Sequence, residues 1–173
     1  MFQFNIMLIG FMGVGKSSIS NCLKKKTGMK EIDMDAVISK EAGMPITEIF
    51  EKYGEEHFRE LETALLERLQ GEKGCIISCG GGTVLRSHNV EVMKKQGRIV
   101  LLTAEPETIY ERVKNNNSRP VLNGNMNVEY IRELMAKRQD AYDSAADIRI
   151  STDGKSLDQI ANEIISVLEN SKA

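Results

Sequence analysis

Short hydrophobic runs alternate along this chain with longer segments in which apolar residues recur every three or four positions. The short runs predict strands at residues 5–9, 30–33, 75–78, 98–102 and 147–150. The longer segments predict helices at residues 16–26, 35–42, 46–53, 55–70, 88–96, 106–114, 127–142 and 156–170. Strands that alternate with helices are typical of an α/β protein whose parallel sheet is covered on both faces.

The composition is that of an ordinary globular protein. Its 173 residues suit a single domain spanning residues 1–173, and no apolar run is long enough for a membrane span. A net charge of -2 argues against a general nucleic-acid binder. The cysteines at positions 22, 75 and 79 lack CxxC spacing. The N-terminal segment has the pattern of a strand and not of a signal peptide. We therefore expect a reducing, cytoplasmic setting. No exposed apolar stripe demands a partner, so we expect a monomer.

The strongest motif is "GFMGVGKS", Gly10 to Ser17, which fits G-x-x-x-x-G-K-S/T between a predicted strand and a predicted helix. Glycines let backbone N–H groups turn toward phosphate oxygens, Lys16 places a charge on the β- and γ-phosphates, and the Ser17 hydroxyl is a magnesium ligand. An ordinary glycine turn is the weaker interpretation. A dinucleotide motif fails because its third glycine would fall at Ser18.

The motif predicts a nucleoside triphosphate and Mg²⁺ but does not identify the class of enzyme. The D-x-x-G and N/T-K-x-D motifs of GTPases are missing from suitable places. A small phosphotransferase and a nucleotide-dependent binding protein therefore remain.

Two aspartates follow the second predicted strand, in "EIDMDAVIS". Residues two apart lie on one side of an extended chain, so Asp33 and Asp35 are expected to face the cleft above the strand ends. One carboxylate can reach the magnesium through water, and the other can accept a proton from a substrate hydroxyl. The alternative is that Asp35 only caps the next helix and Asp33 is a solvated turn residue.

Three arginines are candidates for binding an anion. Arg59 has Glu55 and Glu62 at i−4 and i+3, which can fix its guanidinium for bidentate capture of a carboxylate or phosphate. Arg119 precedes a proline, which places it on an extended loop able to close over a nucleotide. Arg138 lies on the helix after that loop. The alternatives are a surface ion-pair helix, a solvated loop arginine and a solvated helix face.

Three consecutive glycines, Gly80 to Gly82, follow the strand "CIIS", where a phosphate-loop protein often has a magnesium-binding aspartate. Bare backbone lets a small ligand approach closely and offers N–H donors, and a side chain at Gly81 is expected to fill that space. The alternative is a flexible turn. Cys79 lies beside this run and is expected to make the site sensitive to thiol reagents unless it is deeply buried.

Together these motifs resemble shikimate kinase. The match runs from "NIMLIGFMGVGKS" through "IDMDAVI", "EEHFRELE", "ISCGGG" and "SRPVL" to "MAKR", over nearly the whole chain. The resemblance implies a nucleoside-monophosphate-kinase-like P-loop fold with a five-stranded parallel sheet. It also implies a substrate-binding region at about residues 34–62 and a lid at about 113–126. The implied reaction moves the γ-phosphoryl of ATP to the 3-hydroxyl of shikimate, in the chorismate pathway to aromatic amino acids.

The resemblance also implies roles for single residues. Asp35 matches the residue that binds the shikimate hydroxyls and is the candidate base. Asp33 matches the carboxylate that reaches the metal region through water, and Arg119 matches the lid arginine. The remaining matches are Gly13, Val14, Gly15, Lys16, Ser17 and Ser18 for ATP and Mg²⁺, Arg59, Gly80, Gly81, Gly82 and Arg138 for shikimate, and Arg112 and Lys155 for the adenine side. A gluconate-type kinase and a non-catalytic relative remain as rivals, although the latter is expected to have lost Lys16, Asp35 or Arg119.

Overall fold

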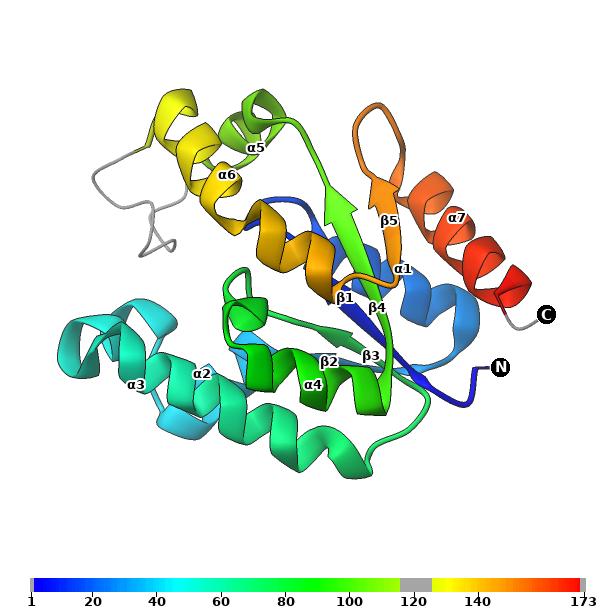
Figure 1. The fold of residues 1–173 in the computed structure, drawn as a ribbon, viewed down its shortest axis with the longest axis horizontal. Coiled ribbons are helices and arrows are strands. Elements are labelled where there is room, and N and C mark those ends of the chain that lie inside the picture. The colour runs from blue at the N-terminus through cyan, green and yellow to red at the C-terminus, as the bar shows by residue number, and fades with distance from the viewer. Residues whose placement is uncertain (1, 116–125, 172–173) are drawn as a thin grey trace.

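The strands form one parallel sheet in a computed structural model that describes residues 2–115 and 126–171. The strand order is β2-β3-β1-β4-β5 (Figure 1). The strands are β1 (Asn5–Ile9), β2 (Lys30–Asp33), β3 (Cys75–Ser78), β4 (Gly97–Thr103) and β5 (Ile148–Ser151). The expectation of a five-stranded parallel sheet is confirmed, and each predicted strand agrees with the observed one to within a residue or two.

Helices cover both faces of this sheet. α1 packs against α7, α4 packs on β4 and on α3, and α5 packs against α6 (Figure 1). The helices are α1 (Lys16–Thr27), α2 (Met34–Ala42), α3 (Ile46–Arg68), α4 (Ser87–Gln96), α5 (Pro106–Val113), α6 (Val128–Ala145) and α7 (Leu157–Asn170). Two short 3₁₀ helices, η1 (Leu69–Gly71) and η2 (Thr83–Leu85), follow α3 and the glycine run.

α3 is bent at Gly54, whose φ of 84° and ψ of 168° are not helical. A positive φ costs a glycine little, because it has no Cβ. The bend separates residues 46–53 from 55–68, so the prediction of two separate helices in this segment is confirmed.

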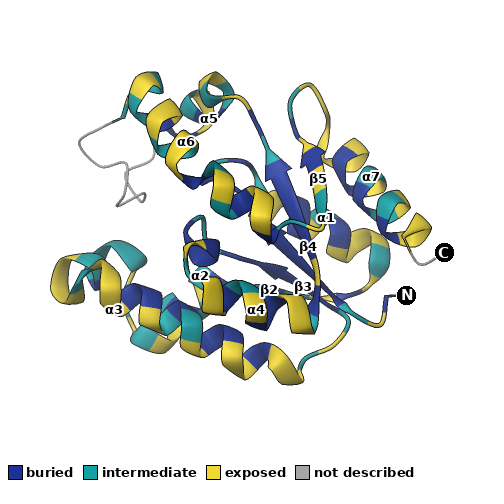
Figure 2. Ribbon diagram, viewed as in Figure 1, coloured by how far each residue is buried: buried dark blue, intermediate teal, exposed yellow. Residues whose placement is uncertain are grey.

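The core lies along the central strands. Every residue of β1 and of β3 is buried, and the helices present a buried stripe inward and an exposed stripe outward (Figure 2). A parallel sheet buried on both faces reads in sequence as short, nearly continuous hydrophobic runs, as it does here. Among the described residues, no helix has both the length and the apolar content needed to cross a bilayer.

The sheet order determines where a ligand can bind. β1 pairs with β3 in parallel, so Leu8 lies beside Ser78 and both strands end at the same edge. β1 continues into the glycine loop at residues 10–15, and β3 continues into the glycine run at 80–82. Two glycine-rich loops therefore emerge side by side at the carboxyl ends of the strands, where open α/β sheets bind their ligands.

Candidate active site

The first glycine loop has the geometry of a phosphate cradle. Gly10, Gly13 and Gly15 have φ values of 147°, 82° and 101°, which L side chains rarely adopt. A Cβ on Gly10 would lie 2.5 Å from the Leu102 carbonyl oxygen. α1 begins directly after the loop with no side-chain cap and no acidic residue in its first turn, so its N–H groups are left for an anion.

Two further side chains complete this half of the site. Lys16 Nζ donates to the carbonyl oxygens of Gly10 at 2.6 Å and Phe11 at 3.2 Å. Ser17 Oγ donates to Asp33 Oδ2 at 3.0 Å. A hydroxyl beside a carboxylate is a hard-oxygen donor pair of the kind that Mg²⁺ accepts when phosphate and water supply the other ligands. The residues present therefore fit the expected magnesium.

The reasoning that paired Asp33 with Asp35 is corrected by the structure. β2 ends at Asp33, and Asp35 lies in the first turn of α2, so the two are not alternate residues of one strand. Asp33 is the residue that caps α2, with Oδ1 accepting from Ala36 N at 3.1 Å. The strand-to-helix junction, and not strand alternation, brings both carboxylates to the same cavity.

Two adjoining cavities meet at Asp35. One, of about 410 Å³, is lined by the phosphate loop, Lys16, Ser17 and Asp33. The other, of about 310 Å³, lies against α2, α3 and the glycine run. The two share Asp35 with Met12, Gly80 and Gly81. A group bound in one cavity therefore meets a group bound in the other beside the Asp35 carboxylate.

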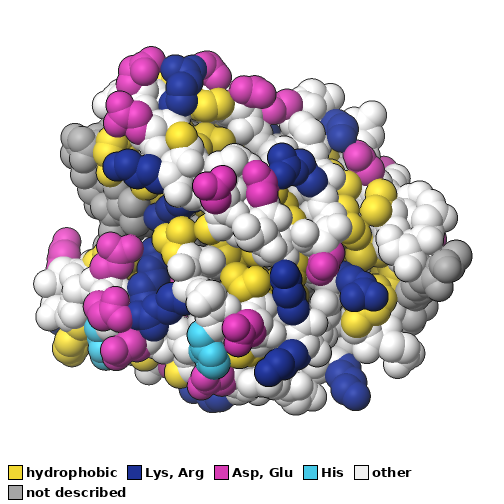
Figure 3. Space-filling view, in the orientation of Figure 1, with side chains coloured by type: hydrophobic (Ala, Val, Ile, Leu, Met, Phe, Trp, Pro, Cys, Tyr) yellow, Lys and Arg dark blue, Asp and Glu magenta, His cyan; other side chains and the backbone are white. Residues whose placement is uncertain are grey.

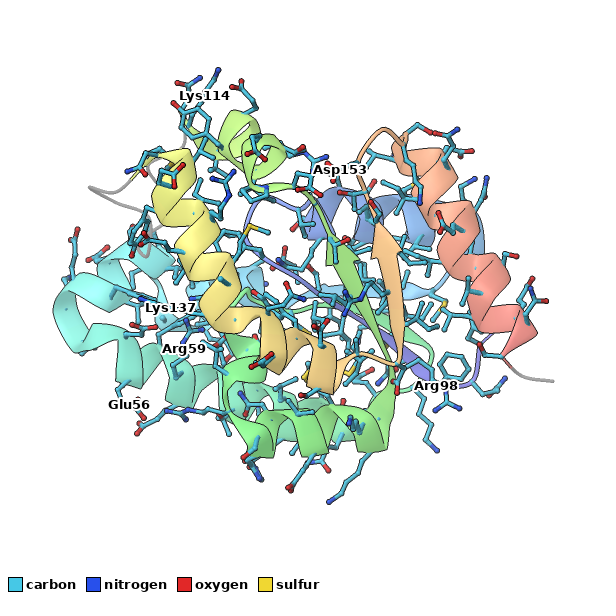
Figure 4. The ribbon with its side chains drawn as sticks, turned by 45° about the horizontal axis from the view of Figure 1, so that its top comes forward. Glu56, Arg59, Arg98, Lys114, Lys137 and Asp153 are labelled. Atoms are coloured by element: carbon cyan, nitrogen blue, oxygen red, sulfur yellow. The ribbon has the colours of Figure 1, made fainter. Side chains whose placement is uncertain are left out.

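Arg59 is fixed in the second cavity by two carboxylates. Its guanidinium donates to Glu62 Oε1 at 2.6 Å and to Glu55 Oε1 at 3.1 Å, and the residue is only 8% exposed. Burial alone would lower the pKa of Arg59, but Glu62 and Glu55 outweigh that effect and raise it. The alternative of a surface ion pair is wrong, and Figure 4 shows Arg59 on the side of α3 that faces α6.

Arg138 reaches the same cavity from α6. It is 5% exposed, and its guanidinium lies 5.7 Å from the centre of the Phe11 ring. Within the described residues, its Nη1 is buried without a hydrogen-bond partner, which is costly unless a ligand supplies one. The alternative of a solvated face is right for Lys137, which is exposed, and wrong for Arg138. Figure 3 shows Lys and Arg side chains gathered at the hollow between α3 and α6.

Close packing accounts for two of the three glycines in the run. None of Gly80, Gly81 and Gly82 has a positive φ, so backbone strain does not select glycine there. A Cβ on Gly82 would lie 2.6 Å from Arg59 Cζ, and one on Gly80 would lie 2.7 Å from Glu62 Oε2. At Gly81 the nearest atoms are 3.4 Å away, which is ordinary contact. The tight positions against the protein itself are therefore Gly80 and Gly82. Gly81 lines both cavities, and that a side chain there would fill the space of a ligand stays a prediction.

The remaining candidates lie in different places. Arg112 Nη1 donates to Val14 O at 3.0 Å and holds the phosphate loop from α5. Lys155 pairs with Glu163 on α7 at 2.7 Å and lines neither cavity. Arg119 and the motif "SRPVL" lie outside the described residues.

The sequence reasoning missed several residues at the site, and two of them, Met12 and Tyr142, bear on its geometry. Met12 lines both cavities, and it occupies a variable position of the phosphate-loop motif, where residue type carries no signal. Tyr142 donates from its hydroxyl to Gly81 O at 2.5 Å. The only sequence signal for Tyr142 is its position one helical turn after Arg138.

We expect Gly82→Ala to lower kcat/KM for the ligand of the second cavity by roughly 10-fold or more, because the new methyl group displaces the Arg59 guanidinium. Steady-state kinetics with varied acceptor would measure the change. Gly71→Ala is the matched control, since its Cβ would meet nothing within 4 Å. Equal kinetics for the two variants would contradict this account of the run.

The expected thiol sensitivity of Cys79 is not supported by the structure. Cys79 is 2% exposed, and burial raises the pKa of its thiol well above the usual range. Native protein treated with iodoacetamide is therefore expected to be alkylated first at the partly exposed Cys22, with activity retained. Peptide mapping that finds Cys79 alkylated in step with loss of activity would refute this.

A phosphate loop that adjoins an arginine-lined cavity, with one carboxylate at the boundary, defines a P-loop phosphotransferase acting on a small acid. The family model described as "Shikimate kinase" matches residues 12–169, and the chain belongs to that family. A shikimate kinase of Persephonella marina is 45% identical over 161 residues, covering 93% of this chain and 96% of the relative. One of Geobacter sulfurreducens is 42% identical over 160 residues, covering 92% and 88%.

Solved structures agree with this assignment. Shikimate kinase from Acinetobacter baumannii, in complex with shikimate, superposes with a TM-score of 0.94 at 30% identity and covers 98% of this chain and 95% of its own. A gluconokinase from Sinorhizobium meliloti superposes with a TM-score of 0.61 at 18% identity, covering 98% and 93%. The second likeness shows a shared fold alone.

Proposed function

We propose that this protein is a shikimate kinase that transfers the γ-phosphoryl of ATP to the 3-hydroxyl of shikimate, giving shikimate 3-phosphate for aromatic amino-acid biosynthesis. The observation that carries the proposal is the placement of Asp35 at the boundary of a phosphate cavity and an arginine-lined cavity. A kinase has to bring its donor and acceptor together at one such point.

The acceptor is held by its acid end. Arg59 and Arg138 reach the second cavity from α3 and α6 and would bind the shikimate carboxylate with charge-assisted hydrogen bonds. Gly80, Gly81 and Gly82 would let the ring approach the backbone closely. The hydroxyl to be phosphorylated then lies beside Asp35, which orients it and accepts its proton.

The donor is held by the phosphate loop, residues 13–18. Lys16 now bonds to two loop carbonyls and would exchange them for phosphate oxygens when ATP binds. Ser17, and Asp33 through water, would hold Mg²⁺, which neutralises charge on the β- and γ-phosphates when bound. Arg112 and Lys155 are proposed for the adenine side, and Arg119 for the lid.

This arrangement needs no covalent intermediate. Phosphoryl transfer passes through a loose transition state, so the protein has to align the two substrates and neutralise charge. Asp35 provides the alignment of the hydroxyl, and Lys16 and Arg119 provide charge near the transferred group. Apolar side chains in the second cavity, Phe50 and Phe58 among them, help to exclude water that would otherwise accept the phosphoryl group.

The organisation of the protein stays a prediction. We infer a single domain over residues 1–173, with a substrate-binding region at about 34–62 and a lid at about 113–126. We also infer a monomer in the cytoplasm that binds neither nucleic acid nor membrane, in keeping with its net charge of -2. Light scattering on the purified protein would test the monomer.

ADP release from Mg-ATP tests the proposal, with shikimate, gluconate and no acceptor in parallel. We expect ADP formation only with shikimate, and its loss when Mg²⁺ is chelated. Turnover with gluconate and not with shikimate would be compatible with the fold but would show that the proposed substrate is wrong. ATP binding without turnover on either acceptor would indicate a nucleotide-binding protein that has no kinase activity.

A further inference from the structure

In the glycine run, residues 80–82, the carbonyl oxygens bond within the protein, whereas the N–H groups do not. All three carbonyl oxygens accept hydrogen bonds from the protein: Gly80 O from Thr83 N at 3.2 Å, Gly82 O from Leu85 N at 3.1 Å, and Gly81 O from the Tyr142 hydroxyl. Within the described part of the chain, the three N–H groups donate to no protein acceptor. The run therefore keeps its donors for a ligand while its acceptors are occupied.

Of these three hydrogen bonds, only the bond from Tyr142 comes from a distant part of the fold, helix α6. The other two are local turns within residues 80–85, whereas the Tyr142 bond crosses from α6 to the loop after β3 at 2.5 Å. A trans peptide plane fixes its N–H opposite its C=O, so holding the Gly81 carbonyl also sets the direction of the following N–H. Tyr142 thus orients a donor that lines the acceptor cavity.

Tyr142 also lies one helical turn after Arg138 on the same face of α6. Both residues are buried, at 4% and 5% exposure. Burial raises the pKa of Tyr142, and the lowering effect of the Arg138 charge does not cancel it. The phenol therefore keeps its proton and remains a donor at neutral pH. Its hydroxyl joins the helix that carries Arg138 to the loop that carries the N–H donors.

We propose that Tyr142 is a positioning residue for the carboxylate of the acceptor. It fixes the glycine run and Arg138 at a set distance, so that backbone N–H groups and a guanidinium meet the same anion. It touches neither the phosphoryl group nor the acceptor hydroxyl, and so it contributes to recognition and not to the transfer step. This inference rests on the proposed function, because it needs an acid acceptor in this cavity.

Tyr142→Phe tests the proposal, because it removes the hydroxyl and keeps the ring. We expect KM for shikimate to rise about 3- to 10-fold, the size of one hydrogen bond, with kcat and KM for ATP within about 2-fold of wild type. The loss should be confined to the carboxylate. For a shikimate analogue with a hydroxymethyl group in place of the carboxylate, kcat/KM should change by less than about 2-fold between wild type and variant.

Tyr110→Phe is the matched control, since Tyr110 packs against the core and no described residue bonds to its hydroxyl. It should leave all three constants unchanged. A Tyr142→Phe enzyme with wild-type KM for shikimate would overturn the inference, as would equal losses for shikimate and the analogue. Wild-type enzyme that fails to phosphorylate shikimate would overturn the proposed function instead.

Discussion

Asp35→Asn is expected to lower kcat by about 10²- to 10⁴-fold, the usual contribution of a general base, while ATP and shikimate still bind. The amide keeps the size of the side chain but cannot accept the proton of the attacking hydroxyl. Asp35 belongs to both cavities, so no other described carboxylate is placed to replace it between the substrates. Single-turnover kinetics with saturating ATP would measure the loss, and isothermal titration would measure binding.

The matched control is Asp140→Asn on the exposed face of α6, which should have wild-type kcat. Unchanged turnover in the Asp35→Asn enzyme would contradict the proposed role of Asp35 as the general base. Loss of binding together with turnover would show that Asp35 has a structural function and does not act in the transfer step.

Arg138→Ala is expected to raise KM for shikimate roughly 10- to 100-fold, since a charge-assisted hydrogen bond contributes about 1.5–3 kcal/mol. KM for ATP should stay near wild type, because Arg138 lines only the second cavity. Arg138→Lys should recover only part of the loss, as an ammonium group lacks the bidentate geometry of a guanidinium. Steady-state kinetics with each substrate varied would measure both constants.

Arg132→Ala on the same helix is the control, because Arg132 is exposed and pairs with Glu107 and Glu129 away from the cavities. An unaltered KM for shikimate in Arg138→Ala would count against the anchoring role. A parallel rise in KM for ATP would indicate a general distortion of the site.

Local patterns predicted the fold well because each strand and helix has its own hydrophobic period. The phosphate loop was predicted by its motif, since the conformation of Gly10, Gly13 and Gly15 depends on glycine at those positions. Even the bend of α3 at Gly54 appeared as a gap between two predicted helices. These features depend on residues close together in sequence.

Contacts between distant segments could not be predicted in this way. Glycine is needed at position 82 because the Arg59 guanidinium, on α3, leaves no room for a Cβ there. The burial of Arg138 depends on how α6 lies over the glycine run. The direction of Asp35 required knowing that β2 ends at Asp33 and that a helix begins there. The Tyr142 bond to Gly81 spans 61 residues and leaves no periodic signal in the sequence.

The position of the phosphate on the product tests the central claim most directly. If the carboxylate is held by Arg59 and Arg138 and one hydroxyl lies beside Asp35, only that hydroxyl can receive the phosphoryl group. A phosphorus–proton correlation spectrum of the product should therefore couple phosphorus to the ring proton on carbon 3. Coupling to the protons on carbon 4 or 5, or a hydroxylamine-sensitive acyl phosphate on the carboxylate, would contradict this account of the site.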